Sequence, residues 1–372
     1  MNSQDVAVER QRYAVVMAAG IGSRMKSSRP KPLIRICGKP MIVHILEALA
    51  EADVLDVVIV VGHKADVVQE QVTKFAPTKM RISFVTQQVQ RGTGDAVLVS
   101  MTALPDPLKF KGSQPSVIIL PGDAPLIRGE TIARMLSEHE EDRRALTVAF
   151  GQLDDPAGYG RLVFDKNGNI KKIVEEKDAS ELERDERRIN SSFYVSNLDV
   201  LLPAVRRLQP LNAQGEYYFT DVVEVLASSG YKVSGFEILD YSEAGGVNDR
   251  AQLAQAEVVM RERINASFML KGVNLVNPSS IYIDSTVEIG QDTTLWPGTS
   301  LIGRTIVGDG VEIGPDVRVA NSIIGDRARI IRSELERCRV GEGAVVGPYA
   351  VMKSGSSIGD FGVSGSFVVL EQ

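Results

Sequence analysis

Residues 283–319, IDSTVEIGQDTTLWPGTSLIGRTIVGDGVEIGPDVRV, carry an aliphatic side chain at every sixth position. The period slips by one residue at Ile324 and then continues to Ile358, and a glycine often follows the aliphatic residue. This pattern is typical of a parallel β-helix, whose triangular coils stack one short strand per hexapeptide. About 90 residues of repeat predict about five coils of three hexapeptides each. The expected inward positions are Ile283, Ile289, Leu295, Leu301, Val307, Ile313, Val319, Ile324, Ile330, Val340, Val346, Met352 and Ile358.

Upstream of the repeat, short β-branched runs alternate with stretches of helical spacing. Strands are expected at 13–17, 57–61, 81–86, 117–120 and 146–150, and helices at 41–50, 65–74, 96–103 and 131–140. This alternation predicts an α/β domain with a mostly parallel sheet covered on both faces. Residues 151–247 have a mixed pattern without a linker, so they are expected to extend the same domain. Residues 250–271 lack glycine and proline and predict a single helix before the repeat.

Composition excludes several classes of protein. The 372 residues include 42 Lys and Arg against 48 Asp and Glu, a net charge of −6 that argues against a dedicated nucleic-acid binder. The longest aliphatic run, 57–61, is far shorter than a membrane helix requires, and residues 1–12 have no apolar core of a signal peptide. Two cysteines cannot form a disulfide framework, so we expect a reducing, cytoplasmic location. Three histidines make zinc or Ser-His-Asp chemistry a poor expectation.

The segment AAGIGSRMKSSRPKPL, residues 18–33, directly follows the first expected strand. It matches neither a P-loop nor a dinucleotide fingerprint, because GxxxxGK[ST] is absent and Met25 stands where a third glycine would be. Small residues and free backbone N–H groups beside Arg24 and Lys31 are what a triphosphate needs. The alternative is a surface loop with solvated charges.

A second segment, LPGDAPLI at 120–127, places Asp123 at the carboxyl end of a strand. Open α/β sheets bind ligands at that edge, and a carboxylate there is a natural Mg²⁺ ligand. The alternative is an aspartate that stabilises a turn. Further polar segments are scattered: residues 87–96, 155–162, 174–179, 188–195, 215–221 and 245–250.

In these segments Gly92 precedes a helix expected near Thr93, close enough to contact a base or ribose. Thr220 precedes an apolar helical run and would serve as its N-cap. Glu175 and Asn190 could each hydrogen-bond a sugar, although the residues by themselves favour ordinary surface polar positions.

The order of these motifs resembles the uridylyltransferase half of the bacterial bifunctional N-acetylglucosamine-1-phosphate uridylyltransferase / glucosamine-1-phosphate acetyltransferase family. The resemblance runs from about Tyr13 to the C-terminus. The segment AAGIGSRM with Lys31-Pro32 is shared by sugar nucleotidyltransferases at large, whereas GYGR, IVEEKDA, GEYYFTD and GVNDR are far more specific. The resemblance implies a Rossmann-like nucleotidyltransferase domain at 13–248, after a tail at 1–12. A linker helix at 249–272 and a truncated left-handed β-helix at 273–372 would follow.

The resemblance also implies a role for each matching residue. Uracil and ribose would be held by Ala18, Ala19 and Gly20, and uracil read by Gln87, Gly92 and Thr93. The triphosphate would be neutralised by Arg24 and Lys31, and Mg²⁺ held by Asp123 and Asn248. The sugar pocket would be lined by Gly160, Glu175, Asn190, Tyr218 and Thr220.

The implied reaction forms UDP-N-acetylglucosamine from UTP and N-acetylglucosamine 1-phosphate. A sugar-phosphate oxygen attacks the α-phosphorus of UTP in line and expels pyrophosphate. A phosphate dianion is already a competent nucleophile, so catalysis would come from positioning and from charge neutralisation by Mg²⁺, Lys31 and Arg24. Asp123 would be catalytic through the Mg²⁺ that it holds. No catalytic histidine is required, which agrees with the scarcity of histidine.

Three departures from the family pattern are visible. Asn190-Ser191-Ser192 stands where the family has Asn-Thr-Gly, and Asp95 stands where His or Asn usually follows GTG. An acid there would repel phosphate unless it points away or helps with the metal. In the family further coils carry the acetyl-CoA site and its catalytic histidine, whereas this sequence has no histidine after His139. Acetyltransferase activity is therefore expected to be absent.

Two alternatives stay open at this point. One is a nucleotidyltransferase for another hexose 1-phosphate, such as glucose 1-phosphate. The other is a catalytically silent scaffold or regulatory subunit, although Arg24, Lys31, Asp123 and Asn248 are all retained. Expected partners are small-molecule substrates, with no nucleic acid and no membrane, and the β-helix is expected to form a homotrimer.

Overall fold

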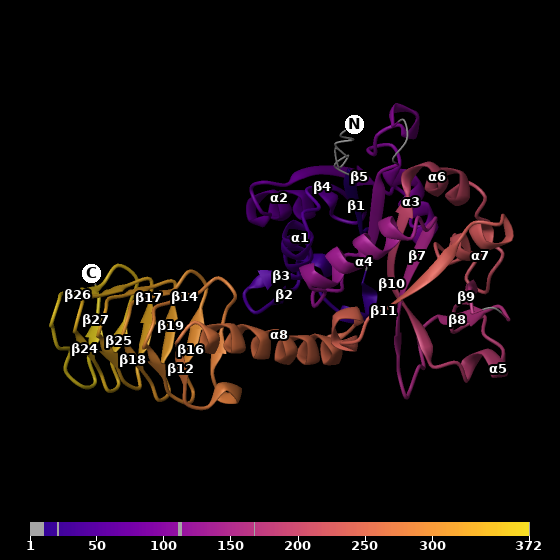
Figure 1. The fold of residues 1–372 in the computed structure, drawn as a ribbon. Coiled ribbons are helices and arrows are strands. Elements are labelled where there is room, and N and C mark those ends of the chain that lie inside the picture. Colours follow the sequence, from indigo (N-terminus) through magenta and orange to yellow (C-terminus); the bar gives the residue numbers. More distant parts are fainter. Residues whose placement is uncertain (1–10, 21, 111–113, 167, 372) are drawn as a thin grey trace, which may run out of the picture. The chain divides into compact units, whose positions relative to one another are not determined.

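The computed structural model describes residues 11–20, 22–110, 114–166 and 168–371. The chain folds into two compact units (Figure 1). The first comprises the described residues up to Gln252 except Arg35–Lys39, and the second comprises Arg35–Lys39 with the described residues from Leu253 onward. Of the tail expected at 1–12, residues 1–10 lie outside the described residues, and Arg12 already belongs to the first strand.

A nine-stranded mixed sheet forms the centre of the first unit, with the main strand order β11-β7-β10-β6-β1-β4-β5. β1 (Arg12–Ala18) runs parallel to β4 (Asp56–Val61) and β6 (Ser116–Pro121), and β5 (Arg81–Thr86) runs parallel to β4. β10 (Arg188–Asn197) is antiparallel to β6 and to β7 (Leu146–Gln152), and β11 (Val233–Glu237) is parallel to β7. β8 (Arg161–Phe164) pairs with β10 and with β9 (Ile170–Val174). The predicted α/β class and mostly parallel sheet are confirmed.

Helices cover both faces of this sheet. Successive side chains of β1 point to opposite faces and join two apolar clusters, one with each layer of helices. Ala14 and Val16 pack in one cluster with residues of α1 (Met41–Glu51), α2 (Ala65–Phe75) and α4 (Gly129–Glu141). Val15 packs in the other with residues of α3 (Thr93–Ser100), α6 (Leu198–Val205) and α7 (Asp221–Ser228). A short helix, α5 (Glu181–Arg184), has a complete capping box at Ser180 and Glu183. No helix of the described chain is both long and apolar enough to cross a bilayer.

The second unit contains α8 (Arg250–Leu270), in which the described chain passes from one unit to the other. A parallel β-helix follows, with three sheets ordered β12-β15-β18-β21-β24, β13-β16-β19-β22-β25-β27 and β14-β17-β20-β23-β26. Five or six strands per sheet confirm the expected number of coils. A two-stranded sheet is formed by β2 (Arg35–Ile36) and β3 (Lys39–Pro40). The strands are β12 (Asn274–Leu275), β13 (Tyr282–Ile283), β14 (Glu288–Ile289), β15 (Thr294–Leu295), β16 (Ser300–Ile302), β17 (Ile306–Val307), β18 (Glu312–Ile313), β19 (Arg318–Ala320), β20 (Ile323–Ile324), β21 (Arg329–Ile330), β22 (Glu334–Glu336), β23 (Arg339–Val340), β24 (Val345–Val346), β25 (Val351–Met352), β26 (Ser357–Ile358) and β27 (Val369–Leu370).

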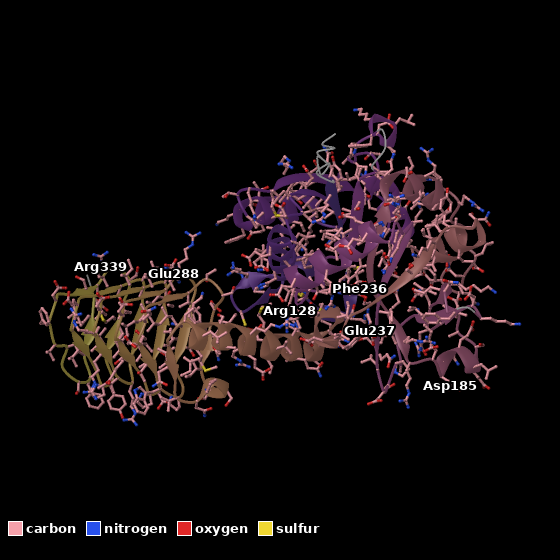
Figure 2. The ribbon with its side chains drawn as sticks, viewed as in Figure 1. Arg128, Asp185, Phe236, Glu237, Glu288 and Arg339 are labelled. Carbon is pink, nitrogen blue, oxygen red and sulfur yellow. The ribbon has the colours of Figure 1, made fainter. Side chains whose placement is uncertain are left out.

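The predicted aliphatic positions form the interior of the β-helix. All belong to its core cluster or pack against it, and Leu335 joins them as an inward position that the six-residue period missed. Steps of five residues precede Ile324, Leu335 and Val340, yet the strands stay in register with the neighbouring coils. Several outward positions carry charge, as Glu288 and Arg339 show (Figure 2).

The glycines of the repeat allow adjacent coils to approach closely. A Cβ added at Gly308 would lie 2.2 Å from Asp326 Oδ1 on the next coil. The Asp326 carboxylate accepts a hydrogen bond from the backbone N–H of Asp309 at 3.0 Å, which explains the short approach. Any larger residue would have to displace this contact, so the sequence places glycine there.

Candidate active site

The loop after β1 places two cations next to each other. Arg24 lies in the 3₁₀ turn Ser23–Met25, and Lys31 begins the 3₁₀ turn Lys31–Leu33. Gly22 has φ of 67°, and a Cβ added there would lie 2.8 Å from Lys31 Cβ. Glycine is therefore needed both for the backbone conformation and for packing against Lys31.

Asp123 and Asn248 meet the loop although they lie far apart in the sequence. Asp123 follows β6 at its carboxyl end, as predicted, and its backbone carbonyl accepts a hydrogen bond from Val247 N at 2.8 Å. This bond holds the 246–248 segment beside β6. Together with Gly20, Gly22, Arg24 and Lys31, these residues line a pocket of about 260 Å³.

Cations and oxygen ligands converge inside this pocket. The Lys31 ammonium forms an ion pair with Asp123 Oδ2 and donates to Asn248 Oδ1 at 2.9 Å. Arg24 Nη2 also donates to Asn248 Oδ1 at 2.9 Å. One carboxylate oxygen and one amide oxygen thus face the same cation, which is a donor set that suits a hard divalent ion. The described residues contain no cluster of three or more His, Cys, Asp or Glu, so such an ion would need water and phosphate oxygens as further ligands.

The predicted sugar-pocket residues form a second group at the carboxyl end of β9. Thr220 Oγ1 donates to Glu175 Oε1 at 3.1 Å, and a Cβ added at Gly160 would lie 3.4 Å from Glu175 Oε2. Asn190 N donates to the Gly160 carbonyl at 2.8 Å, which brings β10 to the same place. Tyr218 lies two residues before Thr220 in the sequence. Its hydroxyl accepts a hydrogen bond from Gln214 Nε2.

Burial and charge distinguish Glu175 from an ordinary surface residue. Burial raises the pKa of its carboxyl, while the Thr220 hydrogen bond opposes the rise. Thr220 occupies the N-cap position of α7, as expected, but its side chain makes no capping bond and donates to Glu175 instead. The expectation of a capping hydroxyl is therefore wrong, because the hydroxyl donates to the partly buried carboxylate of Glu175 instead.

The departure at Asn190-Ser191-Ser192 has a local structural consequence. Ser192 has φ of 63°, in the left-handed region that favours glycine, and the ladder between β10 and β7 shifts register between Asn190 and Tyr194. Asn190 Oδ1 accepts a hydrogen bond from Ser192 N at 3.1 Å, and Asn190 Nδ2 donates to Tyr194 Oη at 2.7 Å. The amide of Asn190 is thus fixed within the bulge.

The predicted base-reading residues lie on a third segment, between β5 and α3. Gln87 is 4% exposed and follows β5, and Gly92 has φ of 109° where an added Cβ would lie 2.5 Å from the Tyr217 carbonyl. Thr93 Oγ1 accepts a hydrogen bond from Phe219 N at 2.9 Å, so the 91–94 turn packs on the GEYYFTD segment. Asp95 is buried and accepts from Gln87 and Arg91, so it does not point freely at a phosphate. None of these residues lines the 260 Å³ pocket.

Ala18 and Ala19 are buried at the end of β1, with Ala18 lining the pocket. The Ala19 carbonyl lies against the 61–63 turn, where a Cβ added at Gly62 would lie 2.6 Å from it. Gln90 Nε2 donates to the same carbonyl at 3.4 Å. The first predicted nucleotide segment is therefore next to the segment that contains the base-reading residues.

Two residues of the site were not assigned a role from the sequence. Arg161, the last residue of GYGR, is 2% exposed and pairs with Glu176 at 2.8 Å, which ties GYGR to EEKDA and lowers the pKa of Glu176. Gln252 Oε1 accepts a hydrogen bond from Asn248 N at 2.7 Å and so orients Asn248. The signal for Arg161 was its place in a specific motif, whereas nothing in the sequence indicates Gln252.

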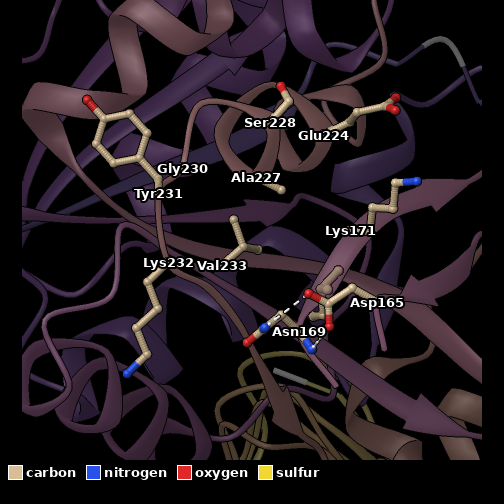
Figure 3. A pocket seen from close by; sticks show the side chains of 11 residues that line it. Asp165, Asn169, Lys171, Glu224, Ala227, Ser228, Gly230, Tyr231, Lys232 and Val233 are labelled. Atoms are coloured by element: carbon tan, nitrogen blue, oxygen red, sulfur yellow. Dashed lines mark hydrogen bonds between the residues drawn. The ribbon is translucent and has the colours of Figure 1, made fainter. Parts of the chain in front are cut away.

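A larger hollow of about 490 Å³ lies elsewhere on the first unit (Figure 3). Its lining includes Lys171, Glu224, Tyr231 and Lys232, from the start of β9, from α7 and from the start of β11. It contains none of the predicted site residues. Volume alone therefore does not identify the active site, which is distinguished by its converging cations and oxygen ligands.

Comparison with known proteins shows the family of this chain. Residues 13–253 match the nucleotidyl transferase family, and residues 286–321 match the bacterial transferase hexapeptide family of six repeats. The bifunctional protein GlmU of Halalkalibacterium halodurans is 38% identical over 97% of this chain and 77% of its own length. The bifunctional protein GlmU of Caldanaerobacter subterraneus subsp. tengcongensis is 41% identical over 93% of this chain and 72% of its own length. This chain belongs to the GlmU family.

Family membership confirms the resemblance and the predicted enzyme class. The protein is a nucleotidyltransferase, a uridylyltransferase that forms UDP-N-acetylglucosamine. Among solved structures, a UDP-glucose pyrophosphorylase complexed with UDP-glucose matches 68% of this chain and 99% of its own, with a TM-score of 0.55 and 18% identity. At that identity the likeness supports the fold alone.

Proposed function

We propose that the nucleotidyl transfer takes place in the 260 Å³ pocket, with Lys31 and Arg24 bound to the triphosphate. The observation that carries this proposal is the convergence of both cations with Asp123 and Asn248 at the carboxyl edge of the sheet. Binding of a triphosphate would draw the ammonium of Lys31 onto phosphate oxygens. The cations then oppose the charge that builds up as the α-phosphorus is attacked and pyrophosphate leaves.

Asp123 and Asn248 would hold Mg²⁺ once Lys31 turns to the phosphate. Both offer oxygen atoms, which Mg²⁺ prefers, and both already face one cation. When bound, the ion would neutralise negative charge on the phosphate oxygens. Gln252 Oε1 accepts a hydrogen bond from the backbone N–H of Asn248 and so holds Asn248 in place. The backbone N–H of Val247 donates to the Asp123 carbonyl and holds Asp123 beside it.

The second group of residues would select the sugar. The Glu175 carboxylate would accept from a sugar hydroxyl, and Gly160 leaves room that a side chain would fill. Asn190 and Tyr218 would add polar contacts, with Thr220 keeping Glu175 in position. Ala18, Ala19, Gly20, Gln87, Gly92 and Thr93 would surround the nucleoside.

The test is release of pyrophosphate in the presence of Mg²⁺. UTP, CTP, ATP, GTP and dTTP are each combined with N-acetylglucosamine 1-phosphate, glucose 1-phosphate and glucosamine 1-phosphate. We expect the strongest rate for UTP with the N-acetylated sugar phosphate. A stronger rate with glucose 1-phosphate would overturn the assignment of the sugar pocket, and folded protein without any release would overturn the assignment of the pocket to nucleotidyl transfer.

We infer further that the β-helix assembles into a homotrimer. Ile306 and Ile323 are neighbours across β17 and β20, point outward and are 43% and 41% exposed. Adjacent apolar side chains on a flat sheet face are suited to burial against another chain. Light scattering should give the mass of three chains, whereas the mass of a single chain at working concentration would contradict the assembly. The absence of acetyltransferase activity stays a prediction from the sequence.

A further inference from the structure

The side-chain amide of Gln87 is held in one orientation. Gln87 Nε2 donates to the Gly92 carbonyl at 3.1 Å and to Asp95 Oδ2 at 2.8 Å. A primary amide has two N–H donors, and here both face groups that can only accept. Turning the amide over would place its carbonyl oxygen against a carbonyl and a carboxylate. The amide nitrogen therefore faces α3, and Oε1 remains for another partner.

The side chain of Asp95 is held in place by its surroundings. Its side chain is 4% exposed, and Arg91 Nη2 donates to Asp95 Oδ1 at 2.6 Å. Asp95 also lies in the first turn of α3, where the helix dipole favours negative charge. One carboxylate oxygen is thus bound by Arg91 and the other by Gln87, so the unusual acid after GTG has two partners inside the protein.

The free oxygen of Gln87 defines what it can recognise. Among the described residues, no hydrogen bond to Gln87 Oε1 is present. A carbonyl oxygen accepts from an N–H and repels another acceptor. In uracil the N3 position carries a hydrogen, whereas in cytosine N3 is an acceptor. An amide that can present only its oxygen therefore favours uracil.

We propose that Asp95 is a positioning residue that sets the preference for uracil over cytosine by fixing the amide of Gln87. The inference rests on the proposed function, in which the nucleobase lies against Gln87. Without Asp95, only the Gly92 carbonyl still holds the amide nitrogen, so the turned amide, which presents Nε2 as a donor to cytosine N3, becomes more populated. Asp95 acts through Gln87 and contacts no substrate itself.

The test compares dissociation constants for UTP and CTP by calorimetry in Asp95→Ala, Asp95→Asn, Arg91→Ala and the parent protein. In Asp95→Ala the preference for UTP should fall by about tenfold, the value of one hydrogen bond. Asp95→Asn has one acceptor oxygen for two donors, so Arg91 can take that oxygen and leave Nδ2 facing Gln87; its preference should fall as in Asp95→Ala. Arg91→Ala leaves Asp95 Oδ2 in place and should keep the parent's preference within about twofold.

A merely structural role for Asp95 makes a different prediction. In that case Asp95→Ala would weaken UTP and CTP binding by the same factor, and this result would overturn the inference. Gln87→Met removes the amide at similar volume and should lower the preference as much as Asp95→Ala does. If Asp95→Ala fails to fold, an unchanged preference in Gln87→Met overturns the inference. Binding ratios need no turnover, so a failure of the proposed chemistry would be seen separately in the pyrophosphate assay.

Discussion

The hydroxyl of Thr220 donates a hydrogen bond to Glu175 Oε1 at 3.1 Å and joins the start of α7 to the end of β9. The side chain of Glu175 is partly buried, and this burial raises the pKa of its carboxyl above the usual value of 4.5. The hydroxyl opposes this rise because it stabilises the charged form. Ionisation of Glu175 is thus set by the balance of the two.

This balance predicts a pH-dependent affinity for the sugar phosphate. As pH falls toward the raised pKa, Glu175 becomes protonated, and the KM for N-acetylglucosamine 1-phosphate should rise. Thr220→Val removes the opposing hydroxyl, so the rise in KM should begin at a higher pH. Steady-state kinetics across pH measure both effects. Glu175→Gln should give a KM that does not follow this titration, and Glu181→Gln, which changes an exposed glutamate, is the control. A pH profile of KM that Thr220→Val leaves unchanged would contradict the prediction.

Ionisation of Asp221 makes the stability of the fold depend on pH. Burial, followed by the charges of Glu224 and Asp178, raises the pKa of Asp221 from 3.8 to about 6. The folded state then holds a proton that the unfolded state has released, so stability should fall as pH rises from about 4 to about 6. Urea unfolding at several pH values should show Asp221→Asn gaining stability above pH 6. Asp199→Asn, which changes an exposed acid in the first turn of α6, is the control. An identical loss of stability with pH in Asp221→Asn would contradict this prediction.

We expect Lys31 to contribute far more to catalysis than an exposed lysine does. Its ammonium contacts both oxygen ligands of the pocket, and its stem packs on Gly22. Lys31→Ala should lower kcat/KM by on the order of 100-fold, a usual loss for a group that stabilises transition-state charge. The exposed Lys79→Ala should behave like the parent. If both variants have parental kinetics, the loop does not bind the triphosphate.

Ser192→Gly should stabilise the protein. Ser192 adopts φ of 63°, which costs a residue with a Cβ about 1 to 2 kcal/mol and costs glycine little. The hydrogen bond from its backbone N–H to Asn190 does not need the side chain. We expect a gain of about 1 kcal/mol in the free energy of unfolding, reduced by the entropy of glycine in the unfolded chain. Ser192→Ala, which keeps a Cβ, should not gain, and a loss of stability in Ser192→Gly would contradict the strain.

Periodicity predicted much of the fold because it reports which side chains are buried. The six-residue repeat gave the β-helix and its inward positions, but not Leu335, because local turns shortened the steps around it. The run before Asp123 placed this residue at a strand end. By contrast, the approach of Asn248 to Lys31, 217 residues away, depends on how β6 binds the 246–248 segment. Spacing along the chain contains no information on such a contact, so only family resemblance joined the two.

The burial of Arg161 and the use of Thr220 by Glu175 were also beyond the sequence alone. Both depend on a partner carboxylate whose position is fixed by the β8–β9 hairpin. A residue type tells what bonds a side chain can make, and tertiary structure decides which it makes. Asp95 illustrates this, since its carboxylate accepts hydrogen bonds from Arg91 and Gln87.

The central claim is that the pocket between the loop after β1 and the end of β6 performs Mg²⁺-assisted nucleotidyl transfer. The most direct measurement is pyrophosphate release by Asp123→Asn with Mg²⁺, UTP and N-acetylglucosamine 1-phosphate, beside the exposed Asp185→Asn as control. Loss of the charged oxygen should remove most turnover while circular dichroism and thermal unfolding stay like the parent's, because Asp123 lies at a sheet edge. Near-parental turnover in folded Asp123→Asn would show that Asp123 is only a turn residue, and would contradict the claim.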